Sequence, residues 1–344
     1  MKTEINVGAI KRNFNLISKA TEKPLILMCK ADAYGHGAAR VVREVSAAYY
    51  GVATEEEGVP LRELGKNVLV TAPSFCGIAL CRRYGMIPLI GDMEIAKRAV
   101  ACGVERCRIK VNSGMNRLGF TGEKECFAAA RFLARNGVTV EGADTHYKDD
   151  SDQNVQCQNE RFKSAVVAVR SALAEEGQEG RFFTSVTECG ATFAKEFDFL
   201  RVGLAAYGYH NASTAGIPLE LAMKVYSEVI KVKTVKAGET LGYTDAFTAS
   251  KKLKAYTVLG GYGDGIARSD AGRRVFAAGR RLTVAAVSMD TFEMISDRVD
   301  LSVGTRVIIL SRAADAAYIA KHRGTIPYEV LLGFNVPRAN RIYV

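Results

Sequence analysis

The segment Leu25-Ile26-Leu27-Met28-Cys29-Lys30-Ala31-Asp32-Ala33-Tyr34-Gly35-His36-Gly37 decides the fold prediction for this chain of 344 residues. Its first five residues are an uninterrupted apolar run, which is typical of a strand buried in a parallel sheet. The run gives way at Lys30 to a polar, glycine-containing stretch, which indicates that the strand ends there. The segment therefore predicts a buried strand whose carboxyl end carries a lysine.

Seven more apolar runs follow, and several of the segments between them have the apolar spacing of helices, for example Ile95 to Cys102, Glu123 to Asn136 and Asn159 to Glu176. Eight strands that alternate with helices predict an α/β fold, an N-terminal (β/α)8 TIM-type barrel. The predicted strands are Leu25 to Cys29, Tyr49 to Ala53, Val68 to Ala72, Ile87 to Ile90, Cys107 to Val111, Val138 to Ala143, Phe182 to Val186 and Leu200 to Ala205.

Beyond about Ile217 the pattern changes to short, alternating, β-branched runs separated by glycine-containing turns. This pattern predicts a C-terminal all-β domain of antiparallel strands. The expected domains are residues 1–217 for the barrel and 218–344 for the β-domain. The predicted strands include Val225 to Val235, Leu253 to Val258, Arg281 to Val287 and Arg306 to Leu310.

Composition narrows the class of protein. The net charge is +10, but the basic residues are spread along the chain without an aromatic-rich basic stretch, so no nucleic-acid partner is expected. The first residues lack an apolar signal region and no later run is long enough to span a membrane, which predicts a cytoplasmic protein. The eight scattered cysteines are expected to be reduced thiols, and no metal site is predicted.

Lys30 is the first candidate for chemistry, because a lysine at the carboxyl end of a barrel strand lies on the catalytic face, where it can react with an aldehyde. A single lysine there is more often a solvated loop residue. The whole octapeptide from Lys30 to Gly37, however, resembles the cofactor-lysine motif of the alanine racemase family. The resemblance extends to Ile326-Pro327-Tyr328-Glu329-Val330 near the end of the chain. It implies an amino-acid racemase that holds pyridoxal 5'-phosphate as a Schiff base on Lys30.

The resemblance assigns roles to further barrel residues. Arg117, in Asn116-Arg117-Leu118-Gly119, matches the arginine that holds the substrate carboxylate and the cofactor phenolic oxygen, and Lys110 matches a lysine that is often carbamylated. His146, in Thr145-His146-Tyr147, matches a partner of the arginine at the pyridine nitrogen, expected here to be Arg201. The remaining implied cofactor contacts are Tyr34, Cys189, Gly203, Leu204 and Tyr328, of which Cys189 stands where the family usually has serine.

Racemisation needs a base on each face of the substrate carbanion, and Lys30 can serve one face. The resemblance implies that Tyr243 is the opposing base, delivered by the β-domain of the second subunit in a head-to-tail homodimer. Tyr262 matches a tyrosine at the substrate entrance, and Met289 matches a methionine whose backbone helps bind the substrate carboxylate.

The resemblance favours alanine as the substrate, with supply of D-alanine for the bacterial cell wall as the implied role. Tyr328 also argues for a small side chain, because an aromatic ring there crowds the pocket beyond Cβ. Serine, or a broad-specificity or diamine racemase, remains the alternative. A non-catalytic homologue that carries pyridoxal phosphate is a rival function, although such a protein does not need Arg117, Tyr243 and Tyr262 together. A decarboxylase on the same barrel is a further rival, but the chain is short and its β-domain resembles that of racemases.

Overall fold

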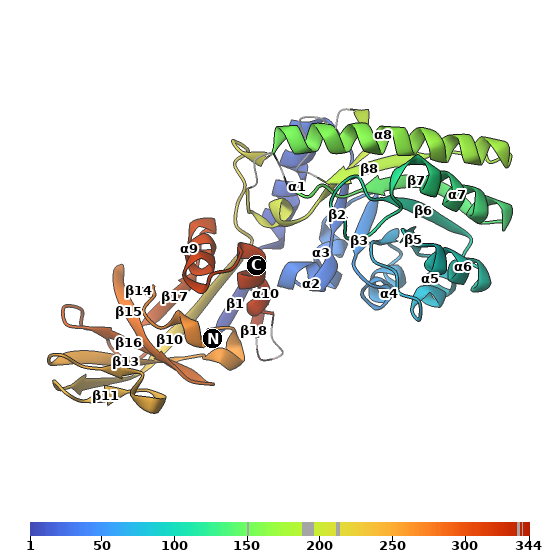
Figure 1. Ribbon diagram of the computed structural model, residues 1–344. Helices are drawn as coiled ribbons and strands as arrows, with labels where there is room; N and C mark the ends of the chain where they lie inside the picture. Colours follow the sequence, from blue (N-terminus) through green and yellow to red (C-terminus); the bar gives the residue numbers. More distant parts are fainter. Residues whose placement is uncertain (150, 188–195, 211–213, 336–337, 339) are drawn as a thin grey trace. The chain divides into compact units, whose positions relative to one another are not determined.

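The computed structural model describes residues 1–149, 151–187, 196–210, 214–335, 338 and 340–344. The chain divides into two compact units (Figure 1). The barrel unit comprises Ile10–Ala33 and Gly37–Glu220, and the β-domain comprises Met1–Ala9, Tyr34–His36 and Leu221–Val344.

The barrel unit contains the predicted TIM-type barrel. Its eight strands are parallel and pair in chain order, and β9 pairs back with β2 to close the ring. The four residues of β2 are all buried, as expected for a strand with side chains packed on both faces. The strands are β2 (Leu25–Met28), β3 (Tyr49–Val52), β4 (Val68–Val70), β5 (Ile87–Ile90), β6 (Arg106–Val111), β7 (Thr139–Thr145), β8 (Phe183–Thr187) and β9 (Phe199–Val202).

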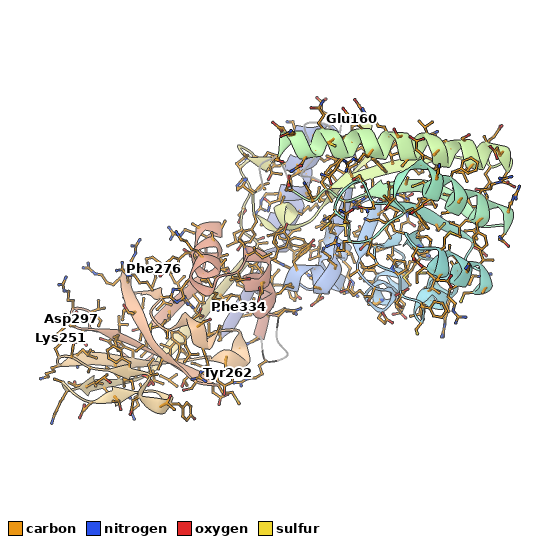
Figure 2. The ribbon with its side chains drawn as sticks, viewed as in Figure 1. Glu160, Lys251, Tyr262, Phe276, Asp297 and Phe334 are labelled. Atoms are coloured by element: carbon orange, nitrogen blue, oxygen red, sulfur yellow. The ribbon has the colours of Figure 1, made fainter. Side chains whose placement is uncertain are left out.

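Helices surround these strands, and Figure 2 shows Glu160 pointing to solvent from the outer face of α8. The three helices predicted from apolar spacing are present, although α8 begins seven residues before the predicted start. The helical elements are α1 (Val7–Thr21), α2 (Lys30–Gly35), α3 (Ala38–Glu44), α4 (Glu55–Glu63), α5 (Ile78–Tyr84), α6 (Met93–Ala101), α7 (Gly122–Arg135), α8 (Asp152–Glu175) and the 3-10 turn η3 (Leu204–Tyr207).

The β-domain is built on one eight-stranded sheet in the order β13-β16-β15-β14-β17-β10-β1-β18. The additional pairing of β13 with β10 closes the first six strands of this order into a ring. Lys251 and Asp297 form an ion pair at its surface (Figure 2). The strands are β1 (Lys2–Ile5), β10 (Met223–Val235), β13 (Leu253–Leu259), β14 (Arg274–Ala277), β15 (Arg280–Val287), β16 (Thr291–Ser296), β17 (Arg306–Leu310) and β18 (Asn340–Tyr343).

Smaller elements complete the described part of the β-domain, which includes two helices that the sequence pattern did not predict. These helices are α9 (Ala313–Arg323) and α10 (Pro327–Gly333). A short hairpin of β11 (Thr240–Leu241) and β12 (Phe247–Thr248) encloses the turn η5 (Tyr243–Asp245). Two further 3-10 turns, η6 (Tyr262–Asp264) and η7 (Arg268–Asp270), lie between β13 and β14.

The N-terminus departs from the predicted domain division. Residues 1–9 were expected in the barrel, but β1 pairs antiparallel with β10 and parallel with β18, so this segment belongs to the β-domain. The division near the middle of the chain falls at Glu220 and Leu221, three residues beyond the expected position. A four-residue strand does not reveal its partners in sequence, because strand pairing is a long-range contact.

Candidate active site

Lys30 follows β2 after one intervening residue, Cys29, and is half-buried. The next four residues have φ between +49° and +56°, so α2 is a left-handed turn built from non-glycine residues. Left-handed backbone costs an L-residue roughly 1 kcal/mol, so neighbouring contacts must hold this turn in place.

Two carboxylates provide those contacts. Glu57 on α4 accepts the Ala31 N–H at 2.8 Å and the Ala53 N–H at 2.8 Å. Asp32 accepts the Ala38 N–H at 2.7 Å on its side chain. The backbone that follows Lys30 is thus held by carboxylate hydrogen bonds at Ala31, where the turn begins, and at Ala38, after the turn.

The loop after β6 carries Arg117 and folds back onto the strand. Phe120 N–H donates to the Lys110 carbonyl at 2.9 Å, and Asn112 N–H donates to the Phe120 carbonyl at 2.9 Å. Gly119 makes this return possible, since it has φ +121° and a Cβ there would lie 2.6 Å from the Asn112 nitrogen. Arg117 is exposed at the carboxyl end of the barrel.

Arg201 on β9 is buried, and residues of β7 and β8 hold its guanidinium. Nη1 donates to the Asp144 carboxylate at 2.8 Å and to the Ser185 carbonyl at 3.2 Å. Nη2 donates to the Thr145 carbonyl. Asp144 and Thr145 are the last two residues of β7, and His146 follows them directly. Arg201, the arginine expected at the pyridine nitrogen, is therefore bound by the two residues that precede His146.

Burial and neighbouring charges shift the pKa values of two of the predicted barrel residues, Lys110 and His146. The pKa of Lys110 is lowered to about 7. Burial is the largest cause and the charge of Arg201 is the second, and the charges of Arg117 and Lys30 act in the same direction. Burial and the same cations, together with Lys110, lower the pKa of His146 to about 2. His146 is therefore a neutral imidazole at physiological pH, and Lys110 is partly an uncharged amine.

The turn after β9 brings further residues to the same end of the barrel. Gly203 precedes η3, and Leu204 begins it; both are buried. Tyr207, in the same turn, donates its hydroxyl to the Met28 carbonyl at 2.8 Å, at the end of the strand that precedes Lys30. Cys189 lies outside the described residues.

In the β-domain, Tyr243 begins η5 and its side chain is 73% exposed. Thr244 and Asp245 in this turn have φ of +54° and +53°, and the Thr244 hydroxyl donates to the Tyr243 carbonyl at 2.7 Å. Gly242 has φ +79°, and a Cβ there would lie 2.5 Å from the Ala286 Cβ. The turn is therefore specified by local contacts that present Tyr243 to solvent.

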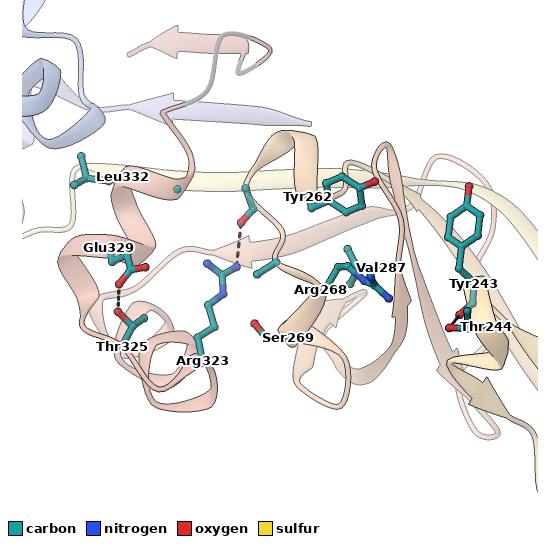
Figure 3. A pocket seen from close by; sticks show the side chains of 13 residues that line it. Tyr243, Thr244, Tyr262, Arg268, Ser269, Val287, Arg323, Thr325, Glu329 and Leu332 are labelled. Carbon is teal, nitrogen blue, oxygen red and sulfur yellow. Dashed lines mark hydrogen bonds between the residues drawn. The ribbon is translucent and has the colours of Figure 1, made fainter.

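Tyr262 and Met289 lie on two segments joined by backbone hydrogen bonds. Tyr262 N–H donates to the Ser288 carbonyl and Gly263 N–H to the Met289 carbonyl, both at 3.0 Å. Tyr243 and Tyr262 share a cavity of about 890 Å³ with Arg268 (Figure 3). Arg323 fixes the end of the Tyr262 turn, since its Nη2 donates to the Gly265 carbonyl at 3.0 Å.

The two tyrosines expected at the phosphate, Tyr34 and Tyr328, also approach each other. Their ring centroids are 6.0 Å apart and their planes are tilted by 56°. Tyr34 is buried, whereas Tyr328 is 40% exposed. Residues nearly 300 positions apart in sequence are thus adjacent in the β-domain.

Some residues that shape the site were not predicted to have a role. Asp144, Ser185 and Tyr207 contact Arg201 or the end of β2, and Glu57 holds the turn after Lys30. For Asp144 a signal was available, because a carboxylate is rarely found in a buried barrel strand without a partner. The other three resemble ordinary polar or aromatic residues in sequence.

Comparison with known proteins gives the family. The model for "Alanine racemase, N-terminal domain" matches residues 5–211, and the model for "Alanine racemase, C-terminal domain" matches residues 222–343. The alanine racemase of Thermodesulfovibrio yellowstonii is 30% identical over 369 residues, covering 100% of this chain and 98% of that protein. A Streptococcus pneumoniae alanine racemase is 30% identical, covering 98% and 97%.

Solved structures agree in fold. The alanine racemase from D-cycloserine producing Streptomyces lavendulae has a TM-score of 0.86 at 26% identity, covering 100% of this chain and 96% of that one. The Bartonella henselae alanine racemase, solved with covalently bound pyridoxal phosphate, has a TM-score of 0.87 at 22% identity, covering 100% and 99%. Among the described residues, no helix is long and apolar enough to cross a membrane. The resemblance inferred from the sequence motifs is confirmed: the chain belongs to the alanine racemase family.

Proposed function

We propose that this chain is a pyridoxal-phosphate-dependent racemase that interconverts L- and D-alanine. The observation that carries the proposal is that Lys30, Lys110, Arg117, His146 and Arg201 lie at or beyond the carboxyl ends of β2, β6, β7 and β9, at one end of the barrel. Family membership and the names of the relatives support the same reaction.

The residues present fit the cofactor. Lysine and arginine side chains at the carboxyl ends of the strands suit a ligand with a phosphate, a phenolic oxygen and an aldehyde. Lys30 would bind the cofactor covalently, Arg201 would face its ring nitrogen, and Arg117 would face its phenolic oxygen. Gly203 and Leu204 would donate backbone N–H groups to the phosphate, with Tyr34 and Tyr328 beside it. When bound, the cofactor supplies an electron sink that makes the substrate Cα proton removable.

The protein's own groups move the proton. The Lys30 Nζ acts on one face of Cα and the Tyr243 hydroxyl on the other, one removing the proton and the other returning one. Arg117 and the Met289 backbone hold the substrate carboxylate, and Tyr262 lines the entrance. His146 does not shuttle protons, because burial and Arg201 keep its pKa far below neutral.

Tyr243 is assigned to a second copy of the chain in a head-to-tail homodimer. Its 73% exposure and its place beside Tyr262 at a cavity of the β-domain support a surface that another subunit completes. The proposal includes carbamylation of Lys110, which requires an uncharged amine, and a pKa of about 7 supplies that form near neutral pH. It also includes a cytoplasmic location and supply of D-alanine for cell-wall peptide.

Chiral analysis of each L- and D-amino acid, after incubation with purified protein and pyridoxal phosphate, tests the reaction. Alanine is expected to be inverted fastest. Inversion of serine or of a diamine in preference to alanine would replace the substrate assignment. If no amino acid were inverted although the cofactor bound, the chain would be a carrier of pyridoxal phosphate.

The Tyr243→Phe variant tests the second base. We expect it to bind the cofactor as the wild type does but to lose at least 100-fold in racemisation, since a general base typically contributes 10²- to 10⁴-fold, about 3 to 5 kcal/mol. Tyr318→Phe, at another exposed tyrosine of the β-domain, is the control and should remain active. Racemisation unchanged in Tyr243→Phe would remove Tyr243 from the mechanism.

A further inference from the structure

Four charged side chains form a row inside the barrel. Arg108 is on β6, Glu141 and Asp144 are on β7, and Arg201 is on β9. The Glu141 carboxylate lies 3.3 Å from Arg108 Nε, Arg108 Nη1 lies 3.9 Å from Asp144 Oδ2, and Asp144 Oδ1 lies 2.8 Å from Arg201 Nη1. We call these four residues the charge row. It ends at Arg201, next to the site.

The inner members of the charge row are shielded from water. The side chains of Arg108 and Asp144 are 0% exposed, and that of Arg201 is 3% exposed. A buried charge without a partner destabilises a protein by several kcal/mol, so these residues depend on one another. Asp144 lies between two guanidinium groups and is the counter-ion that they share.

The two arginines are held in different ways. Arg108 Nη1 and Nη2, and Asp144 Oδ2, have no hydrogen-bond partner among the described residues. The Arg108 guanidinium instead lies 4.6 Å from the ring centre of Tyr49 and 5.9 Å from that of Phe183. Arg108 therefore acts on Asp144 through charge, while the hydrogen bonds of Asp144 go to Arg201 and Ser185.

We propose that Asp144 is a positioning residue: it fixes the Arg201 guanidinium and offsets part of its positive charge at the end of the barrel where the cofactor ring binds. The inference rests on the proposed function for the place of the ring. Glu141 pairs with Arg106 and Arg108, so it does not share this task.

The charges around the site give the direction of the effect. The groups acting there are Lys30 on α2, Lys110 on β6, Arg117 in the loop after β6, His146 after β7, Arg201 on β9 and Asp144 on β7. Asp144 raises the pKa of Lys110, whereas Arg201, Arg117 and Lys30 lower it. Replacing Asp144 by a neutral residue removes a negative charge, so protonated groups nearby become less stable and their pKa values fall.

The experiment compares Asp144→Asn with Glu55→Gln, which neutralises another fully buried carboxylate of the same barrel unit, hydrogen-bonded to Ser74. In the holoenzyme, the visible absorbance of bound pyridoxal phosphate is titrated with pH. In the apoprotein, kept in CO₂-free buffer so that Lys110 is a free amine, the Lys110 pKa is measured by NMR of ¹³C-labelled lysine. We expect both midpoints to move to lower pH by about one unit in Asp144→Asn. Glu55→Gln should leave both unchanged.

If Asp144→Asn does not fold, a double variant provides the same test. Arg108→Met/Asp144→Asn removes two opposite buried charges together, which proteins often tolerate, and still deprives Arg201 of its counter-ion. The expected shift has the same sign. Loss of thermal stability with neither midpoint moved would reduce Asp144 to a structural residue and overturn the inference. Failure of the wild type to bind the cofactor would instead refute the proposed function, and the Lys110 measurement would still decide the role of Asp144.

Discussion

At the scale of single residues, the barrel site places charges where a folded protein normally avoids them. Lys110 is buried among cations, and its pKa is lowered from 10.5 to about 7 by burial first and by Arg201 second. A group whose pKa falls on folding binds protons less readily in the native state. Its burial therefore costs stability at every pH below the unfolded pKa, and the cost declines as pH rises from about 7 toward 10.5.

Lys110→Met should consequently stabilise the apoprotein at pH 7, by on the order of 3 kcal/mol, because methionine fills similar space without a charge. The gain should shrink at pH 9.5, where the wild-type lysine loses little on folding. Urea unfolding in CO₂-free buffer at the two pH values measures both quantities. Lys97→Met, at an exposed lysine, is the control. A gain of equal size at both pH values would contradict the electrostatic explanation.

At the scale of elements, the turn α2 is distinguished by its left-handed backbone. Residues Ala31 to Tyr34 all have positive φ, a conformation that glycine adopts without the steric cost that Cβ brings. Glu57 and Asp32 offset this cost with hydrogen bonds to Ala31 and Ala38. The strain lies directly after Lys30, so it restricts the backbone from which that side chain projects.

Substituting alanine by glycine should therefore change the free energy of unfolding in opposite directions in α2 and α7. Ala31→Gly relieves a left-handed residue and is expected to raise the free energy of unfolding by up to about 1 kcal/mol. Ala128→Gly, at an exposed position of the right-handed helix α7, should lower it by about 1 kcal/mol. Urea unfolding of both variants checks the pair. If Ala31→Gly destabilised as much as Ala128→Gly, α2 would not carry the strain assigned to it.

At the scale of the whole molecule, the proposed chemistry is divided between two units. The barrel unit carries Lys30 and Arg201, and the β-domain carries Tyr243 and Tyr262. Tyr243 is the most exposed of the large apolar and aromatic side chains of the described residues. In a head-to-tail dimer each site would combine the barrel of one chain with the β-domain of the other.

Hybrid dimers test this arrangement. A Lys30→Ala chain and a Tyr243→Phe chain are each expected to be inactive alone. After co-refolding in equal amounts, half of the dimers should be hybrids, each with one intact site, and about a quarter of wild-type racemisation should return. Wild-type chains refolded in the same way provide the reference. No recovery, in a mixture proven to contain hybrids, would place Lys30 and Tyr243 of one site on the same chain.

The sequence by itself determined the fold class and most of the barrel. Its eight apolar runs correspond to eight parallel strands, because a strand buried on both faces must be apolar along its length. The motifs around Lys30, Arg117 and Arg201 likewise indicated the family. These features are local, so a single segment is enough to display them.

Only the tertiary structure decided which distant groups meet. Three sets of contacts join segments far apart in sequence. Strand β1 pairs with β10 and β18, Tyr34 lies near Tyr328, and Asp144 forms ion pairs with both Arg108 and Arg201. Likewise, the pKa values of Lys110 and His146 depend on burial and on charges from other strands. Spacing along a chain specifies which way a side chain points, but packing sets its neighbours and its dielectric environment, and those decide its charge.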